Sequence, residues 1–178
     1  MKLFTTDDIR AIERQTLSTE AITTRTLVER VAEAAATEIA THWRPTQRTV
    51  VLAGPGNNGA DALATAMRLM ERGFAPVVYL FNIGGNSIKD ECVHFRNVMR
   101  SDFPEADFIE IVNTFNTPEL GANDLVIDGL FGSGLREPLN GGFRALVRYI
   151  NESGATVVSI DMPSGMFSDW DRQAPARD

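Results

Sequence analysis

Hydrophobic and polar positions along the chain follow two different periods, which divide it into helical and extended segments. In about the first forty residues, apolar positions recur at helical spacing after a Thr-Asp cap region, so we expect two helices there. The second helix should start near Thr23 to Thr26, because Thr26 and Glu29 have the spacing of a capping box.

Beyond Pro45, short apolar runs alternate with amphipathic stretches. We expect strands at 49–53, 76–81, 108–112, 124–127 and 156–160. Between them we expect helices that end at Gly73, run from Ser87 to Met99, and cover 143–150. Continuous apolar strands separated by such helices indicate a parallel sheet covered on both faces. The fold class is therefore α/β, with a three-layer arrangement, a mostly parallel sheet and two N-terminal helices.

The composition narrows the functional classes. The 178 residues suit one domain, 1–178, and 43% hydrophobic with 23% charged residues is ordinary for a globular protein. The net charge of -7 argues against a nucleic-acid partner, because such proteins usually carry a basic face. We expect no membrane partner, since no apolar run reaches spanning length. The single cysteine, Cys92, cannot form an internal disulfide, and this favours a cytoplasmic location.

The segment 54–61, with the sequence GPGNNGAD, joins the first strand to its helix and has the composition of a phosphate-binding corner. Its three glycines let a ligand approach the backbone, and the first amides of a helix attract anions. Asn57 and Asn58 have an alternative role as N-caps, and Asp61 has one as an acid beside the helix dipole. A cap needs one such residue, which leaves another side chain for a ligand.

Two later strand ends carry polar chemistry of a similar kind. Asp128 follows the fourth strand, where a buried carboxylate needs an arginine, a backbone amide cluster or a cation as its partner. Ser164 lies in the turn Pro163-Ser164-Gly165, where its alternative role is a simple cap. Asn58, Asp128 and Ser164 together offer only oxygens, a set that suits K⁺, Na⁺, Mg²⁺ or Ca²⁺. The single formal charge favours a monovalent ion, although each loop alone is compatible with an ordinary connection.

Asp161 ends the fifth strand and is the best candidate for a general acid/base. A carboxyl group at the mouth of a dry cleft can have its pKa raised toward neutrality, while the alternative is that Asp161 orders the turn after it. Segment 54–59 matches G-x-G-x-x-G, but it lacks the P-loop ending, and no acid for a ribose follows the second strand. We interpret His42 and His94 as residues on helices and Cys92 as a packed thiol.

In combination these motifs resemble the YjeF N-terminal domain family, the NAD(P)H-hydrate epimerases. The resemblance rests on 54–61, on DGLFG at 128–132, on REPL at 136–139 and on SIDMPSG at 159–165. It implies a Rossmann-like fold and a homodimer. It also implies interconversion of the R and S forms of hydrated NADH and NADPH, which carry a hydroxyl at C6 of the reduced nicotinamide. A separate ADP- or ATP-dependent dehydratase then recovers the S form.

The same resemblance implies the site residues. The hydrated nucleotide is expected to contact two segments, Asn57, Asn58, Gly59, Ala60 and Asp61 in the first, and Gly132, Ser133, Gly134, Leu135, Arg136, Glu137 and Pro138 in the second. Asn58, Asp128 and Ser164 match the potassium ligands of the family, so K⁺ is the expected cofactor. Asp161 matches a substrate-contacting aspartate, and we expect it to act as the acid/base that helps the C6 hydroxyl leave and return through an iminium-like intermediate.

The chain departs from the family pattern at three places. Ala60 and Ala62 stand where family members usually have glycine, and 27–32 differs from the usual Leu-Met-Glu-x-Ala-Gly run. The family domain normally continues into further strands, whereas 170–178 is polar and irregular. We therefore expect a sheet without its C-terminal strands and with an exposed edge that invites pairing with another chain.

Other functions remain open beside the epimerase. A non-catalytic dimerising or nucleotide-binding scaffold of the same fold is the main alternative, although a scaffold has no need of Asn58, Asp128, Asp161 and Ser164. The dehydratase would need a second domain, and a nucleotide-dependent dehydrogenase is weakened by the missing ribose-binding acid.

Overall fold

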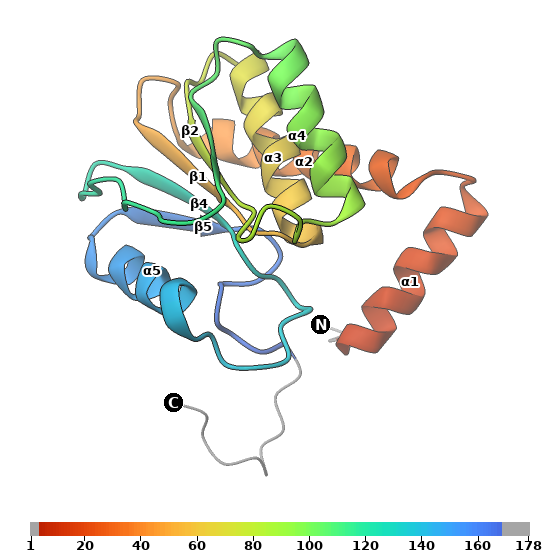
Figure 1. Cartoon of the computed structure of the whole chain (residues 1–178). Helices are drawn as coiled ribbons and strands as arrows, with labels where there is room; N and C mark the ends of the chain where they lie inside the picture. Colours follow the sequence, from red (N-terminus) through yellow and green to blue (C-terminus); the bar gives the residue numbers. More distant parts are fainter. Residues whose placement is uncertain (1–3, 169–178) are drawn as a thin grey trace.

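A computed structural model describes residues 4–168, in which five parallel strands form one sheet (Figure 1). The strand order is β3-β2-β1-β4-β5. The elements are α1 (Thr6–Thr19), α2 (Thr24–His42), β1 (Thr49–Ala53), α3 (Asn57–Glu71), β2 (Val77–Phe81), α4 (Asp90–Asp102), β3 (Phe108–Ile111), β4 (Leu125–Gly129), α5 (Gly141–Glu152) and β5 (Thr156–Ser159). Within residues 4–168, no helix is both long and apolar enough to cross a membrane.

Helices cover both faces of the sheet, which confirms the predicted three-layer α/β arrangement. Helices α2, α3 and α4 lie on one face and α5 lies on the other (Figure 1). The first face buries a cluster that includes Ile39, Leu63 and Leu69 against the strands. The second buries Leu146 and Ile150 with a set of edge-to-face aromatic rings. Burial of apolar side chains on both faces is why the strands read as continuous hydrophobic runs.

The sheet has a topological switch point between β1 and β4. From β1 the chain builds outward through β2 to β3, and then returns to place β4 on the other side of β1. The register pairs Leu52 of β1 with Asp128 of β4, and Asp128 with Ser159 of β5. Loops that leave neighbouring strands at such a point diverge and open a crevice for ligands. The three polar loops found in the sequence therefore meet at one place.

The predicted start of α2 near Thr23 to Thr26 is confirmed, but its predicted capping box and the predicted start of α4 are wrong. Thr23 is the N-cap of α2, where its Oγ1 accepts a hydrogen bond from the Thr26 amide at 3.2 Å, so the expected Thr26–Glu29 capping box does not form. Helix α4 begins at Asp90 and not at Ser87. The Ser87 amide instead donates to Asn82 Oδ1 at 3.1 Å, which holds this segment as part of a turn.

Strand β5 is the outermost strand on its side of the described sheet, and Val157 on it is exposed. This agrees with the expected open edge. The prediction that 170–178 is irregular lies outside the described residues.

Candidate functional site

The glycine-rich corner between β1 and α3 is packed more tightly against protein than the sequence suggests. A Cβ atom on Gly54 would lie 1.8 Å from the Leu130 carbonyl oxygen, and one on Gly59 would lie 1.8 Å from the Gly54 carbonyl oxygen. These two glycines let backbone segments approach one another. A Cβ on Gly56 would meet nothing within 4 Å, so the open side of the corner is at Gly56, the N-cap of α3.

Two hydrogen bonds join the start of α4 to this corner. The Lys89 amide donates to the Pro55 carbonyl at 2.9 Å, and Cys92 Sγ donates to the Gly56 carbonyl at 3.0 Å. Burial raises the pKa of the Cys92 thiol to about 12, so the thiol stays protonated and is a poor nucleophile. The interpretation of Cys92 as a packed thiol is confirmed.

Asp128 is buried, and its partners are backbone amides and hydroxyls. The amides of Leu130 and Ser164 donate to its carboxylate at 3.2 and 2.9 Å. The hydroxyl of Ser164 lies 2.6 Å from Oδ1, and that of Ser159 lies 3.2 Å from Oδ2. Asp128 thus ties the β4 loop to the β5 loop at the base of the crevice.

The Ser164 hydroxyl has two alternative acceptors, because it also lies 3.2 Å from the Phe131 carbonyl oxygen. A hydroxyl carries one proton, so it can donate to Asp128 or to Phe131 but not to both at once. When it donates to Phe131, one oxygen of Asp128 gains a free lone pair. The pair is therefore able to present oxygens to a cation without any movement of the backbone.

Asn58 has an unusual environment for a buried amide. It lies in the first turn of α3 and is 8% exposed, and within residues 4–168 neither Nδ2 nor Oδ1 has a hydrogen-bond partner. An unsatisfied buried amide costs about 1–3 kcal/mol. The predicted alternative that Asn57 or Asn58 is an N-cap is wrong, since Gly56 occupies the cap position and makes no side-chain cap bond. Both atoms of the Asn58 amide are therefore available to a ligand.

Asp161 sits in a strained backbone conformation at the end of β5. Its φ of 63° lies in the left-handed region, and the Met162 amide closes a three-residue turn on the Ile160 carbonyl at 2.8 Å. Such a turn is rare and costs on the order of 1–3 kcal/mol. The Ser133 amide donates to Asp161 Oδ2 at 2.6 Å. The side chain therefore reaches across to the β4 loop instead of ordering the turn that follows it.

Gly132 lies between Asn58 and Asp161. A Cβ atom at Gly132 would lie 2.2 Å from Asp161 Oδ2 and 3.3 Å from Asn58 Cγ. Only a residue without a side chain fits between these two groups. The three polar loops thus converge on one point, as the sequence predicted from their positions at strand ends.

A cavity of about 970 Å³ lies over this point, bordered by the corner, the β4 loop, the β5 loop and α1. Its lining includes most of the predicted substrate residues: Asn57, Asn58, Asp61, Gly132, Ser133, Gly134, Leu135, Arg136, Glu137, Pro138 and Asp161. Gly59 and Ala60 are not among them. Gly59 faces the Gly54 backbone, and Ala60 is 0% exposed within the core below the corner. Neither residue borders the cavity in the part of the chain that the structure describes, and their contact with a ligand stays a prediction.

Part of the cavity is formed by residues of α1, α2 and the start of α4, which the sequence did not indicate. Thr6, Ile9, Arg10 and Glu13 of α1 line it, as do Val31 of α2 and Lys89 before α4. None of these residues carries a recognisable motif. Only the position of α1 beside the strand ends brings its residues there, and that position is set by tertiary contacts such as the Thr6–Ser168 hydrogen bond.

Asp61 has the most perturbed acidity of the site. Its pKa is raised to about 7, first by burial and then by the negative charges of Asp161 and Glu13. The predicted role as an acid beside the helix dipole does not account for this, since a helix N-terminus lowers the pKa of an acid.

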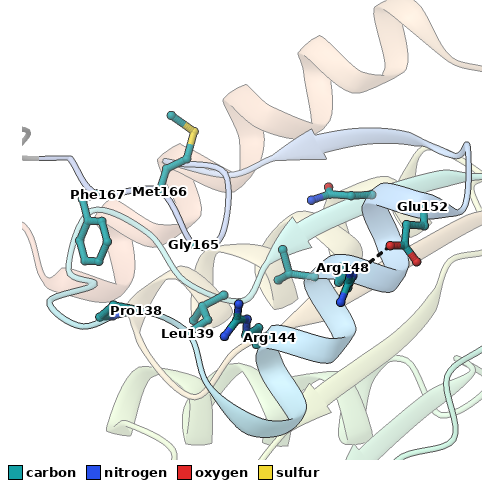
Figure 2. Close-up of a pocket in the computed structure, with 10 residues that line it drawn as sticks. Pro138, Leu139, Arg144, Arg148, Glu152, Gly165, Met166 and Phe167 are labelled. Atoms are coloured by element: carbon teal, nitrogen blue, oxygen red, sulfur yellow. Dashed lines mark hydrogen bonds and ion pairs between the residues drawn. The ribbon is translucent and has the colours of Figure 1, made fainter. Parts of the chain in front are cut away.

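A second cavity of about 800 Å³ lies between α5 and the loop after β5 (Figure 2). It shares Pro138 and Leu139 with the first cavity, and Arg148 on its wall pairs with Glu152 at 3.0 Å. None of Asn58, Asp61, Asp128 and Asp161 lines it. We therefore place the chemistry in the first cavity.

Comparison with known proteins defines the class. The family described as YjeF-related protein N-terminus matches residues 24–176, and the chain belongs to this family. An NAD(P)H-hydrate epimerase of Achromobacter xylosoxidans is 37% identical over 90% of this chain and 72% of its own. One of Limosilactobacillus fermentum is 31% identical over 93% of this chain and 76% of its own.

Two further relatives differ in length or in sequence. A Bifunctional NAD(P)H-hydrate repair enzyme Nnr of Dictyoglomus turgidum is 28% identical, and this chain spans only 32% of it. The crystal structure of the yeast protein ynu0, YNL200c, superposes with a TM-score of 0.75 at 19% identity, over 93% of this chain and 72% of that one. At that identity the likeness supports the fold alone.

Proposed function

We propose that this protein is an isomerase that interconverts the R and S forms of hydrated NADH and NADPH. The observation that carries the proposal is the convergence of Asn58, Gly132 and Asp161 under one cavity at the switch point of the sheet. The relatives at 31–37% identity bear the name of this activity. An unpartnered buried amide and a strained carboxylate mark a ligand site and not a packing surface.

The cavity offers separate regions for the two parts of a hydrated dinucleotide. The open N-terminus of α3 at Gly56, the half-buried Arg10 and the exposed Lys89 suit the phosphates. The region around Gly132 and Asp161 suits the nicotinamide ring, whose C6 hydroxyl must leave and return. In this arrangement Asp161 is the acid/base next to C6, as the family resemblance implies.

Potassium is part of the proposal, because the residues present suit it. Among the described residues the Asn58 side-chain oxygen has no hydrogen-bond partner, and the Ser164 hydroxyl can turn to Phe131 and leave oxygens of Ser164 and Asp128 for a cation. Neutral oxygens with one carboxylate suit a weakly charged, hard ion. Bound there, K⁺ would lie below the nicotinamide end of the site and supply positive charge to it.

A homodimer, a cytoplasmic location and functional coupling to an NAD(P)H-hydrate dehydratase complete the proposal. Exposed apolar residues in and just before α1, namely Phe4, Ile9 and Ile12, support a contact with a second copy. Helix α1 extends away from the α/β body, where a second copy can reach it (Figure 1). The scaffold alternative predicts the same surface but gives no reason for the strain at Asp161.

A coupled assay tests the function. The R form of hydrated NADPH is supplied with an S-specific dehydratase and ATP or ADP, with and without this protein, in KCl or in choline chloride at equal ionic strength. We expect NADPH recovery from the R form only when the protein is present, and faster recovery in KCl. Recovery at the spontaneous rate in both salts would favour the scaffold.

A further inference from the structure

Epimerisation at C6 requires a hydroxyl to leave one face of the ring and water to add to the other. Two proton-transfer groups, one for each face, serve this chemistry better than one, provided that one is protonated while the other is not. Three carboxyl groups besides that of Asp161 border the cavity, those of Glu13, Asp61 and Glu137, and of these only Asp61 lies on the helix that begins at the glycine-rich corner.

The group that could act together with Asp161 is Asp61, which lies just after the first turn of α3. It lines the same cavity as Asp161 but comes from a different element, so the two carboxyl groups approach the cavity from different walls. Within residues 4–168 no hydrogen bond to its carboxylate is found, and the residue borders the cavity. The Asp161 carboxylate, in contrast, accepts the Ser133 amide.

We propose that Asp61 and Asp161 form a pair of carboxyl groups that share one proton and act on opposite faces of C6, with Asp61 as the proton donor. This inference rests on the proposed epimerase function and names the group that completes it. Asp61 donates its proton to the C6 hydroxyl, the C6–O bond breaks with its electron pair leaving on water, and the N1 lone pair forms an N1=C6 iminium. Water then adds to the other face, its proton passes to Asp161, and the π electrons return to N1.

The net result is an inverted C6 centre and one proton moved from Asp61 to Asp161. Return of that proton through solvent, or turnover in the reverse direction, resets the pair. No oxidant or second substrate is needed, because water is both released and consumed. Two carboxyl groups that face one cavity cannot both be ionised without repulsion, and this favours a single shared proton.

The surroundings of Asp61 agree with this assignment. Burial, Asp161 and Glu13 raise its pKa to about 7, so that it carries a proton for a substantial fraction of the time near neutral pH. The other charged or titratable groups that border it or its cavity come from three parts of the chain: Arg10 from α1, Lys89 and Cys92 from the start of α4, and Arg136 and Glu137 from the β4 loop.

Kinetics of Asp61→Asn test the inference, with Asp90→Asn as the matched control. Asp90, like Asp61, is an acid near the N-terminal end of a helix, but it is exposed and does not line the cavity. We expect Asp61→Asn to lower kcat by about 10²- to 10⁴-fold with little change in KM, since a neutral amide keeps the shape of a protonated carboxyl. We expect the decline of wild-type kcat/KM above about pH 7 to be absent from the residual activity. Asp90→Asn should match the wild type.

Carboxyl ¹³C NMR gives a readout that does not depend on activity. We expect the Asp61 carboxyl to titrate near 7 in the wild type and lower in Asp161→Asn. Titration near 4, or an Asp61→Asn rate within threefold of wild type, would overturn the inference. If the wild type titrates as expected but does not epimerise, the proposed function itself fails, and with it the catalytic role of Asp61.

Discussion

At the scale of single residues, the site depends on groups held in costly states. In the part of the chain that the structure describes, the buried Asn58 amide has no hydrogen-bond partner, Asp161 is held at a positive φ, and Asp61 is an acid whose pKa is raised. Each of these conditions lowers the stability of the folded chain, and all three residues line the same cavity. Such conflicts between local preference and structure are typical of functional sites.

Gly132 gives a sharp test of the residue arrangement. A methyl group at this position would lie 2.2 Å from Asp161 Oδ2, so Gly132→Ala must displace that carboxylate. We expect epimerisation to fall at least tenfold, because a misplaced catalytic group costs about this much or more. Gly142→Ala on α5 is the matched control, since among the described residues its Cβ would meet nothing within 4 Å and Gly142 does not line the cavity. Equal activity of the two variants in the coupled assay would contradict the assigned geometry.

Replacement of Asp161 separates binding from chemistry. We expect Asp161→Asn to keep the fold and to bind NADP⁺ within about threefold of the wild type, but to lose about 10²-fold or more in epimerisation rate. Circular dichroism and calorimetric titration check the first two points, and turnover of the R form checks the third. Unchanged turnover would remove Asp161 from the mechanism.

The raised pKa of Asp61 also predicts a dependence of stability on pH. Its folded-state pKa of about 7 exceeds the ordinary value of 3.8, so its contribution to stability is fully present below about pH 4 and is lost as the pH rises through 7. Asp61→Asn cannot lose that contribution. We expect the variant to gain stability relative to the wild type between pH 4 and 8 in urea unfolding. A constant difference would show that Asp61 titrates normally.

At the scale of elements, the alternation of strands and helices and the three polar loops could be predicted from periodicity, because burial on both faces of a parallel sheet imposes it. The start of α4 was less predictable, because the Ser87 amide bonds to Asn82 in the turn after β2 and does not begin the helix. The position of α1 over the cavity and the inward turn of Gly59 and Ala60 depend on tertiary packing. Neither leaves a pattern in the sequence.

The support that α4 gives to the corner is testable at this scale. Cys92→Ala removes the donor to the Gly56 carbonyl and leaves a small void, so we expect a loss of about 1–2 kcal/mol in the free energy of unfolding. Cys92→Ser keeps a hydrogen-bond donor at the same place. We therefore expect it to regain more of the wild-type NADP⁺ affinity than of the wild-type free energy of unfolding. Denaturant unfolding and NADP⁺ titration distinguish the two effects. Identical affinities of the two variants would argue that the thiol only fills space.

At the scale of the whole molecule, α1 connects assembly to the site. Ile9 lines the cavity, whereas Ile12 on the same helix is 45% exposed and does not line it. Pairing of two copies through α1 would therefore also hold one wall of the cavity in place. Phe4 extends the apolar surface of this helix.

The dimer prediction uses Ile12. We expect Ile12→Asp to shift the protein from dimer to monomer in light scattering coupled to gel filtration, because a charge at an apolar contact is costly to bury. Arg148→Asp on α5, remote from α1, should leave the dimer intact. A wild type that is already monomeric at the concentrations of the activity assay would refute the contact.

The central claim is that this chain epimerises hydrated nicotinamide nucleotides, and chromatographic resolution of the two forms tests it without any coupling enzyme. Purified R form of hydrated NADPH is incubated in KCl at pH 7 with wild-type protein, with Asp161→Asn or with buffer alone. The account predicts that catalytic amounts of the wild type bring the R and S forms to equilibrium well before the buffer control, and that Asp161→Asn does not. Equilibration at the same rate in all three samples would contradict it.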